Sequence, residues 1–279
     1  MKRIISMLLC TIMILASFTV VYAADNEYSL TSGDYARLLG RGEMLGMEER
    51  TFNWTNAGFE FIFTGSSAEV YVEKTIITKT PYNGNFFNCA VFDGDVLVRV
   101  ERLKLTEGWN TIYTEQAGDP EVKKIMLVRS SEGCFGLLSM SKLKTDSAPV
   151  ASAPRDILIE FIGDSYTAGY GNSINLSDNK TTGCAENTDN WNSYTGFVAR
   201  NYRADYNVLA YQGIGLYRQG PLKGEGSGNM MEQFEYADTL IRDPLINMTT
   251  KHPHDFSKYQ PNLVTVWLGT NDRAIVSNE

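Results

Sequence analysis

Ser165 is the residue whose type and setting most directly suggest chemistry. It lies in "IEFIGDSYTAGYGN" (159–172), where an apolar run ends at Gly163 and Asp164 and is followed by small residues. A hydroxyl at the end of a buried strand, beside the start of a helix, lies where developing negative charge is favoured. This placement predicts a nucleophilic serine. The structural alternative is a helix cap, which Asp and Ser also form; the G-x-S-x-G turn of another hydrolase class is absent from the chain.

Two later turns could supply hydrogen-bond donors to the same reaction. "AYQGIGLYR" (210–218) places Gly213 and Gly215 after a second apolar run, and "WLGTND" (267–272) places Asn271 after a third. A serine amide, a glycine amide and an asparagine side chain at one sheet edge would give three donors to an oxyanion. Each turn also has a plain structural explanation, because Gly permits tight backbone geometry and Asn is common in turns.

A proton acceptor for Ser165 is harder to find, because the chain has only two histidines. His252 and His254 both lie in "TKHPHDFSKYQPN" (250–262), before the third apolar run. A strand of about seven residues would separate them from its far end by roughly 20 Å. We therefore expect neither to act as the base. A His-x-His metal site completed by Asp255 is the alternative, but no further ligand cluster supports it, and we predict no metal.

The first part of the chain has the pattern of an antiparallel β-sandwich. Apolar residues alternate with polar ones, as in Phe59, Phe61 and Phe63 or Val70 and Val72, and turn residues separate the runs. We predict strands within residues 58–65, 67–74, 87–95, 96–105, 110–118, 123–131 and 134–144. We assign residues 25–146 to this domain, and the Ala-, Ser- and Pro-rich residues 147–155 to a short extended linker.

Residues 156–279 have a different pattern, typical of an α/β layer fold. Continuous apolar runs at 156–163, 206–213 and 262–269 predict buried parallel strands, and 193–204 has the spacing of a helix. Each run ends in Gly, at the edge where such folds bind their ligands.

Residues 1–23 have the features of a secretory signal peptide: Lys2 and Arg3, a short apolar run, and small residues up to Ala23. The apolar run is shorter than the roughly 20 residues of a membrane span. We therefore expect an exported protein, not held in a membrane after cleavage. Without Lys2 and Arg3 its formal charge is −10, which argues against a nucleic-acid partner.

Three cysteines follow the predicted signal peptide: Cys89, Cys134 and Cys184. Their spacing fits neither a zinc site nor a redox motif. A disulfide between Cys89 and Cys134 is one alternative, but isolated buried thiols are favoured.

The three turns together resemble the first blocks of the SGNH, or GDSL-type, hydrolases: "FIGDSYTAGYGN", "GIGLYR" and "DFSKYQPNLVTVWLGTND". More narrowly, the chain resembles carbohydrate esterase family 2, because "FNWTNAGFEFIFTGSSAEVYV", "VFDGD" and "LVRSSEGCFGLL" in the first part also look like that family's sandwich. The resemblance implies a jelly-roll β-sandwich followed by a flavodoxin-like three-layer SGNH domain. It also implies a cofactor-free enzyme that removes acetyl groups from plant polysaccharides such as xylan and mannan.

By the same resemblance, Ser165 would be the nucleophile, and an oxyanion would be bound by the N–H of Ser165, the N–H of Gly215 and the side chain of Asn271. Gly213 is the rival of Gly215. The family's base lies in a later Asp-x-x-His block, which this sequence lacks after Asn271. We therefore expect a chain truncated at its carboxyl end, with an incomplete fold and little activity of its own.

Two other functions remain open at this point. One is an SGNH esterase that acts on lipid or aryl esters. The other is a non-catalytic carbohydrate-binding protein whose aromatic side chains stack on sugar rings; its candidate platform residues are Trp54, Trp109, Trp191, Tyr82 and Tyr170.

Overall fold

The computed structural model describes residues 26–45, 49–77, 84–174, 185–217, 229–237 and 253–276. The predicted signal peptide, residues 1–23, lies outside the described residues. Among the described residues, no helix is long and apolar enough to cross a membrane.

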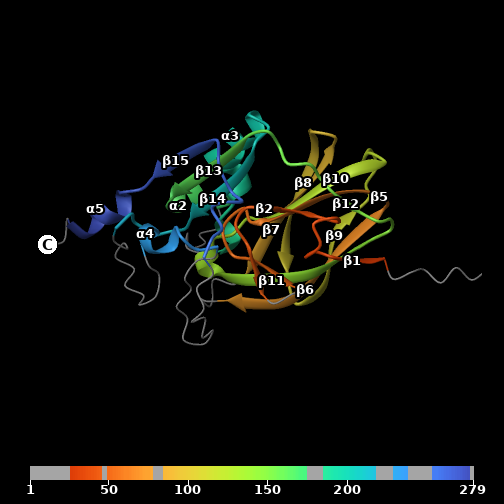
Figure 1. Cartoon of the computed structure of the whole chain (residues 1–279), viewed down its shortest axis with the longest axis horizontal. Helices are drawn as coiled ribbons and strands as arrows, with labels where there is room; N and C mark the ends of the chain where they lie inside the picture. Colours follow the sequence, from red (N-terminus) through yellow and green to blue (C-terminus); the bar gives the residue numbers. More distant parts are fainter. Residues whose placement is uncertain are drawn as a thin grey trace, which may run out of the picture.

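Two antiparallel sheets form a β-sandwich in the first part of the chain (Figure 1). The first sheet contains, in spatial order, β3 (Glu43–Leu45), β4 (Glu49–Phe52), β11 (Gly136–Thr145), β6 (Ser67–Ile77) and β9 (Gly108–Thr114), and β1 (Glu27–Ser29) also pairs with β11. The second contains β12 (Val150–Ala151), β5 (Gly58–Thr64), β10 (Val122–Arg129), β7 (Asn85–Asp93) and β8 (Val96–Leu105), and β2 (Arg37–Leu39) also pairs with β5. The seven strands predicted from residue alternation are thus confirmed.

The core between the two sheets consists of the alternating apolar residues. Phe59, Phe61 and Phe63 are at most 2% exposed, and their rings follow one another along β5 with centroids 6.0 and 5.5 Å apart. Val70 and Val72 of β6 face the same core. One face of each strand is buried because successive side chains of a strand point to opposite sides.

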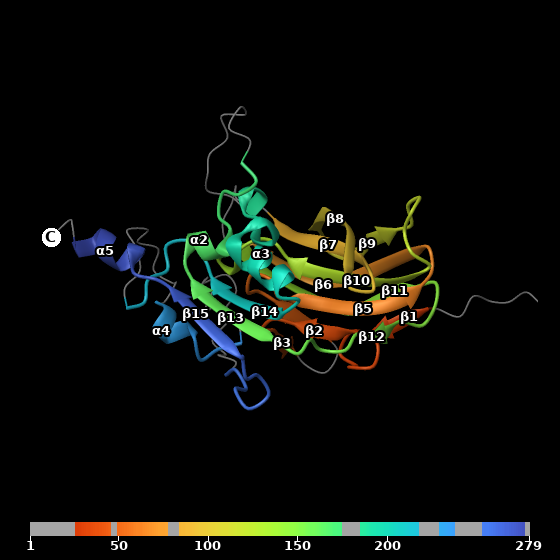
Figure 2. The ribbon, with the colours of Figure 1, turned by 90° about the horizontal axis from the view of Figure 1, so that it is seen from above.

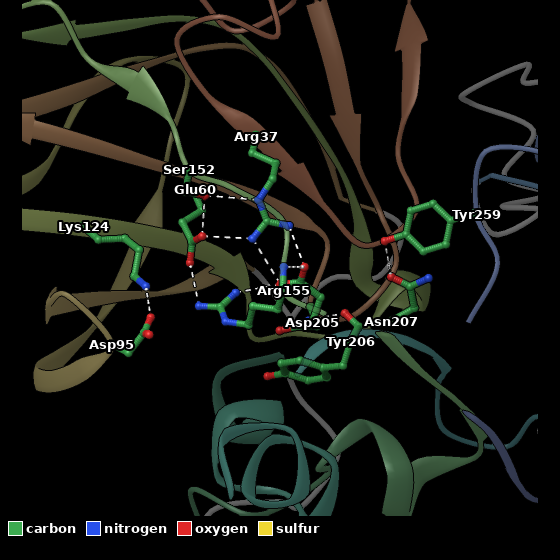
Figure 3. Close-up of polar contacts among 11 residues, drawn as sticks. Arg37, Glu60, Asp95, Lys124, Ser152, Arg155, Asp205, Tyr206, Asn207 and Tyr259 are labelled. Carbon is green, nitrogen blue, oxygen red and sulfur yellow. Dashed lines mark hydrogen bonds and ion pairs between the residues drawn. The ribbon is translucent and has the colours of Figure 1, made fainter. Parts of the chain in front are cut away.

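The segment predicted to be a linker is partly a strand. Val150 and Ala151 form β12 and pair with Ile62 and Phe61 of β5, so the chain runs along the sandwich before it leaves. An ionic network then joins the sandwich to the following sheet (Figure 3). Arg37 and Arg155 each bind both Glu60 and Asp205, at 2.6–3.0 Å.

A three-stranded parallel sheet follows, with β13 (Leu158–Gly163) between β14 (Asp205–Ala210) and β15 (Leu263–Trp267). The α-helices of this part are α2 (Ser165–Ala168), α3 (Tyr194–Asn201), α4 (Met230–Gln233) and α5 (Thr270–Val276). The 3-10 helices are η1 (Gly133–Phe135), η3 (Ala185–Asn187) and η4 (Asn190–Asn192), the first of them in the sandwich part. The chain is therefore a β-sandwich followed by an α/β domain with a parallel sheet.

The two parts pack closely against each other, as Figure 2 shows. An apolar cluster joins Trp191 of η4 to the second sheet of the sandwich; its other members are Leu39, Ala90, Phe92, Met126 and Val128. Phe92 and Met126 belong to this cluster, whereas their neighbours in sequence, Val91 and Ile125, belong to the sandwich core. Successive side chains of these strands therefore point to opposite faces of the sheet. Both faces of this sheet are thus covered.

The prediction that all three apolar runs form buried strands is wrong for the third. β14 is buried throughout, but Val266 and Trp267 of β15 are 62% and 59% exposed. The physical reason is position: β15 pairs only with β13 among the described strands, so it lies at an edge of the sheet. An apolar run in the sequence does not reveal whether a strand is central or at an edge.

The two cysteines that the structure describes, Cys89 and Cys134, are free thiols, as predicted. Cys89 is a buried thiol, and no disulfide joins it to Cys134. Burial raises the pKa of Cys89 to about 12, which makes it a poor nucleophile. Cys184 lies outside the described residues.

Candidate active site

Ser165 begins helix α2, directly after the end of β13. Asp164 caps this helix, because its Oδ1 accepts a hydrogen bond from Tyr166 N at 3.1 Å. Gly163 lets the helix lie close to the strand, since a Cβ there would lie 1.9 Å from Thr167 Oγ1. The turn ends at Gly169, whose φ of +80° favours glycine. The Gly-Asp-Ser sequence thus fixes the path of the backbone on both sides of Ser165.

A second set of contacts holds α2 from the side of η4 and α3. Asn190 Nδ2 donates to the carbonyl oxygen of Thr167 at 2.9 Å. Thr167 Oγ1 and Tyr194 Oη lie 3.0 Å apart in a hydrogen bond. Because both contacts reach Thr167, two residues after Ser165, they fix the helix without occupying the serine hydroxyl.

The carboxyl group of Asp164 is buried behind this turn. It is 1% exposed, and burial raises its pKa above the ordinary value for Asp. Its Oδ1 holds the helix start, while Oδ2 has no hydrogen-bond partner among the described residues. Asp164 therefore orients the serine turn.

The register of the sheet brings all three predicted turns to one edge. Gly163 pairs with Ala210 on one side and with Trp267 on the other, so β13, β14 and β15 end at the same level. The central strand β13 is also where the strand order changes direction, and this is where open α/β sheets bind ligands.

Asn271 contacts the turn that follows β14. Its Nδ2 donates to the carbonyl oxygen of Ile214 at 2.8 Å, between the two candidate glycines. A side-chain amide carries two N–H donors, so this bond orients the group and leaves the second hydrogen for a ligand.

Asp272 reinforces the same junction. Its Oδ2 and Oδ1 accept from Leu216 N at 2.8 Å and from Tyr217 N at 2.9 Å. The turn after β15 is therefore hydrogen-bonded to the turn after β14 through two successive side chains, Asn271 and Asp272.

The choice between Gly213 and Gly215 stays open. Gly213 has a φ of +78°, which gives it a conformational role in the turn. Gly215 accepts a hydrogen bond from Met230 N through its carbonyl oxygen at 2.9 Å. Neither glycine N–H is bonded to another described residue, so both amides remain candidate donors.

Glu132 is a residue of the sandwich that also reaches this site, and it belongs to none of the motifs that predicted the site. It is fully buried, and its Oε2 accepts from the backbone N–H of Gln212, next to Gly213. Its Oε1 accepts from Thr188 Oγ1 at 3.1 Å. A buried carboxylate that binds backbone N–H groups fixes them strongly. The only signal in the sequence is a glutamate among small and apolar residues in "SSEGCFGLL".

His254 lies away from the Ser165 turn. Its ring packs against Phe256 and Tyr259, with centroids 4.9 and 5.6 Å apart. The backbone N–H of His254 donates to the carbonyl oxygen of Glu235. Burial, and then the charge of Arg41, lower its pKa to about 4. The strand after it begins at the amino end of the sheet, where Asn262 N donates to Leu158 O. His252 lies outside the described residues.

The part of the chain that the structure describes contains no grouped set of metal ligands. No three His, Cys, Asp or Glu side chains are grouped to hold a metal ion there.

Two of the five suggested sugar-stacking residues are buried and not available for stacking. Trp54 and Trp191 are 1% and 5% exposed, and Trp54 packs against Tyr211 with ring centroids 6.4 Å apart. Trp109 is partly exposed on the sandwich, Tyr170 is half-buried, and Tyr82 lies outside the described residues. At the sheet edge where Ser165 lies, exposed aromatic residues are Tyr166 and Tyr217, each at 69%, and Trp267 at 59%.

Comparison with known proteins agrees with this geometry. Residues 159–277 match the family model described as GDSL-like Lipase/Acylhydrolase. The chain is also similar to the solved structure of a family two carbohydrate esterase from Clostridium thermocellum in complex with cellohexaose. The match covers 85% of this chain and 66% of the esterase chain, with a TM-score of 0.67 and 25% sequence identity. This match includes the sandwich as well as the α/β domain. The chain thus contains a GDSL-like domain and is similar to carbohydrate esterases of family two.

Two curated proteins are also similar to this chain. The cellulase/esterase CelE of Acetivibrio thermocellus is 28% identical over 78% of the chain and 24% of its own length. An acetylxylan esterase / glucomannan deacetylase of Cellvibrio japonicus is 24% identical over 93% of the chain and 66% of its own length. The chain thus spans about a quarter of the first relative and about two thirds of the second.

Proposed function

We propose that this protein is an exported serine esterase that removes acetyl groups from plant polysaccharides such as xylan or mannan. The observation that carries this proposal is the junction of Asn271 with Ile214 at the sheet edge where Ser165 begins α2. The names of the relatives, acetylxylan esterase / glucomannan deacetylase, support the choice of substrate. Export rests on the signal-like residues 1–23.

The reaction begins when Ser165 Oγ attacks the carbonyl carbon of the acetyl ester. The carbonyl oxygen then becomes an oxyanion, which accepts hydrogen bonds from Ser165 N–H, from Gly215 N–H and from the second N–H of Asn271. The sugar hydroxyl leaves with a proton and an acetyl-serine remains, which water hydrolyses to acetate. Donors fixed before the reaction stabilise the oxyanion without reorganising, and this is the largest usual contribution to such catalysis.

We propose that His254 does not supply the base for this serine. Its ring is packed between Phe256 and Tyr259, and the strand after it starts at the end of the sheet opposite Ser165. Without a base, a serine hydroxyl keeps its ordinary pKa and reacts slowly. Added imidazole should therefore accelerate the reaction at Ser165.

The test is acetate release from acetylated xylan, with and without imidazole, by the parent chain and by Ser165→Ala. The proposal expects release that depends on both imidazole and Ser165. Equal release by the two proteins under both conditions would count against it.

A non-catalytic carbohydrate-binding role is the second candidate. The position of His254 favours it, because a serine without a base can still lie in a site that binds sugar. Sugar binding without Ser165-dependent acetate release, even in imidazole, would favour this second function.

A further inference from the structure

A hollow lies between the two domains, at the opposite end of the sheet from Ser165. We call it the interdomain pocket and define it by Phe92, Leu97 and Met126 of the sandwich and by Arg200, Arg203 and Tyr206 of the α/β domain. Its volume is about 160 Å³, enough for about five water molecules or one small organic group. It lies beside the start of β14, whereas Ser165 follows the end of β13.

The charges around the interdomain pocket do not balance. Arg155 on its rim is neutralised in the network with Glu60 and Asp205 (Figure 3), and Asp95 is paired with Lys124 at 2.8 Å. Arg200 and Arg203 form no ion pair with a described residue. Two positive charges are thus left at one hollow of a chain whose formal charge is −8, and such a local excess attracts anions.

Arg200 is held in a fixed position. Its Nη1 donates to the carbonyl oxygen of Trp191 at 2.7 Å, and its guanidinium lies 4.5 Å from the centre of the Trp191 ring. A guanidinium has five N–H donors, so this one contact leaves others for a ligand. Because its position is fixed, little side-chain entropy is lost when an anion binds.

Arg203 stands at a position that normally favours glycine. It follows helix α3 with a φ of +51°, which costs about 1 kcal/mol or more for a residue with a side chain. Its side chain is exposed at the rim of the pocket. Asp95 and Leu97 of the sandwich line the same pocket as Arg203, which places Arg203 across from the sandwich side of the hollow.

The opposite wall is apolar and contains one unsatisfied polar group. Phe92 and Met126 are each 6% exposed, and Leu97 is partly exposed at the mouth. The Tyr206 hydroxyl, on a residue 7% exposed, has no hydrogen-bond partner among the described residues. Such a group usually has a partner in the functional state. The pocket therefore suits a ligand with one apolar face and one anionic edge.

We propose that the interdomain pocket binds a sugar residue that carries a carboxylate, a uronic acid. The C–H face of the pyranose ring would lie against Met126 and Leu97, and its carboxylate between Arg200 and Arg203. The choice of a sugar rests on the proposed function, whereas the choice of a carboxylate rests on the two arginines. The pocket would then hold the chain on acidic parts of the polysaccharide while Ser165 acts elsewhere on it.

The test is a titration of the whole chain with D-glucuronate, followed by NMR at the Trp191 indole N–H and at the backbone amides of Ala199 and Ala204. D-glucose is the control for the sugar without a carboxylate, and acetate for the carboxylate without a sugar. The test variant is Arg203→Gln. The matched control is Lys258→Gln, which removes one positive charge from an 82% exposed side chain in the same domain.

We expect saturable shifts with D-glucuronate, no saturation with D-glucose, and a Kd about tenfold weaker in Arg203→Gln, the usual effect of losing one hydrogen bond to a charged group. Lys258→Gln and Ser165→Ala should bind as the parent does, so a failure of the proposed esterase activity would not alter this result. Equal Kd values for parent and Arg203→Gln, or saturation by D-glucose with the same affinity, would overturn the proposal. Saturation by acetate at the Kd of D-glucuronate would overturn the assignment of a sugar.

Discussion

The side-chain amide of Asn271 donates to the carbonyl oxygen of Ile214 at 2.8 Å and so joins the turns that follow two different strands of the sheet. Ile214 lies between Gly213 and Gly215, the two candidate glycine donors. The same contact therefore orients the asparagine and fixes the turn that carries the second donor. Several consequences of this arrangement can be measured.

Asn271→Ala should lower kcat by about 10²- to 10³-fold, the usual loss when one oxyanion donor is removed. KM should change much less, because the donor acts mainly on the charge that develops in the transition state. The measurement is the kinetics of acetate release in the presence of imidazole. A variant that raised KM and kept kcat would place Asn271 in substrate binding instead.

Glu132→Ala should lower both stability and turnover. The N–H of Gln212 and the buried hydroxyl of Thr188 would lose this acceptor, and a buried group left unsatisfied costs about 1–3 kcal/mol. Glu132→Gln retains an oxygen for Gln212 and is the matched control. Urea unfolding and acetate release would be measured on both variants. If Glu132→Gln and Glu132→Ala lowered stability and turnover equally, the contact with Gln212 would not be the cause of the loss.

The ionic network between the domains should couple the effects of its members. Asp205→Asn would leave Arg37 and Arg155 without one carboxylate, and breaking such a largely buried pair costs about 3 kcal/mol. Arg155→Gln and the double variant complete a cycle. If the loss of unfolding free energy in the double variant equals the sum of the losses in the two single variants, Asp205 and Arg155 do not interact in a way that stabilises the protein.

His254 should make the protein less stable in mild acid. Its pKa is lowered to about 4 in the folded chain, by burial and by Arg41, against about 6.5 in the unfolded chain. The unfolded state therefore binds more protons between these values, and stability falls as the pH drops from about 6.5 towards 4. In His254→Phe the thermal midpoint should fall less between pH 7 and pH 5 than in the parent; equal falls would contradict the assignment.

Much of this fold could be predicted because it depends on local patterns. Alternation such as Phe59, Phe61 and Phe63 predicted a strand with one face in the core, and the glycines after the apolar runs predicted that the three turns lie at one edge of the sheet. The exposure of β15 could not be predicted, since the run from Leu263 to Trp267 is as apolar as that of a central strand. Its exposure depends on what pairs with it.

The site was only partly visible in the sequence for a similar reason. Ser165, Gly215 and Asn271 each follow a strand, so parallel pairing alone brings them to one edge. Glu132 reaches Gln212 across 80 positions of sequence and from another domain. No periodicity relates two such residues; only the packing of the sandwich on the α/β domain does.

The most direct measurement of the central claim, that Ser165 is the nucleophile, is acetate release from acetylated xylan with increasing imidazole. The parent chain should match Ser165→Ala without imidazole, and should release acetate faster as imidazole increases, while Ser165→Ala stays at the rate of imidazole alone. Mass spectrometry should find the acetyl group on Ser165. Equal rates for both proteins at every imidazole concentration, or an enzymatic rate without imidazole that disappears in His254→Ala, would contradict the account.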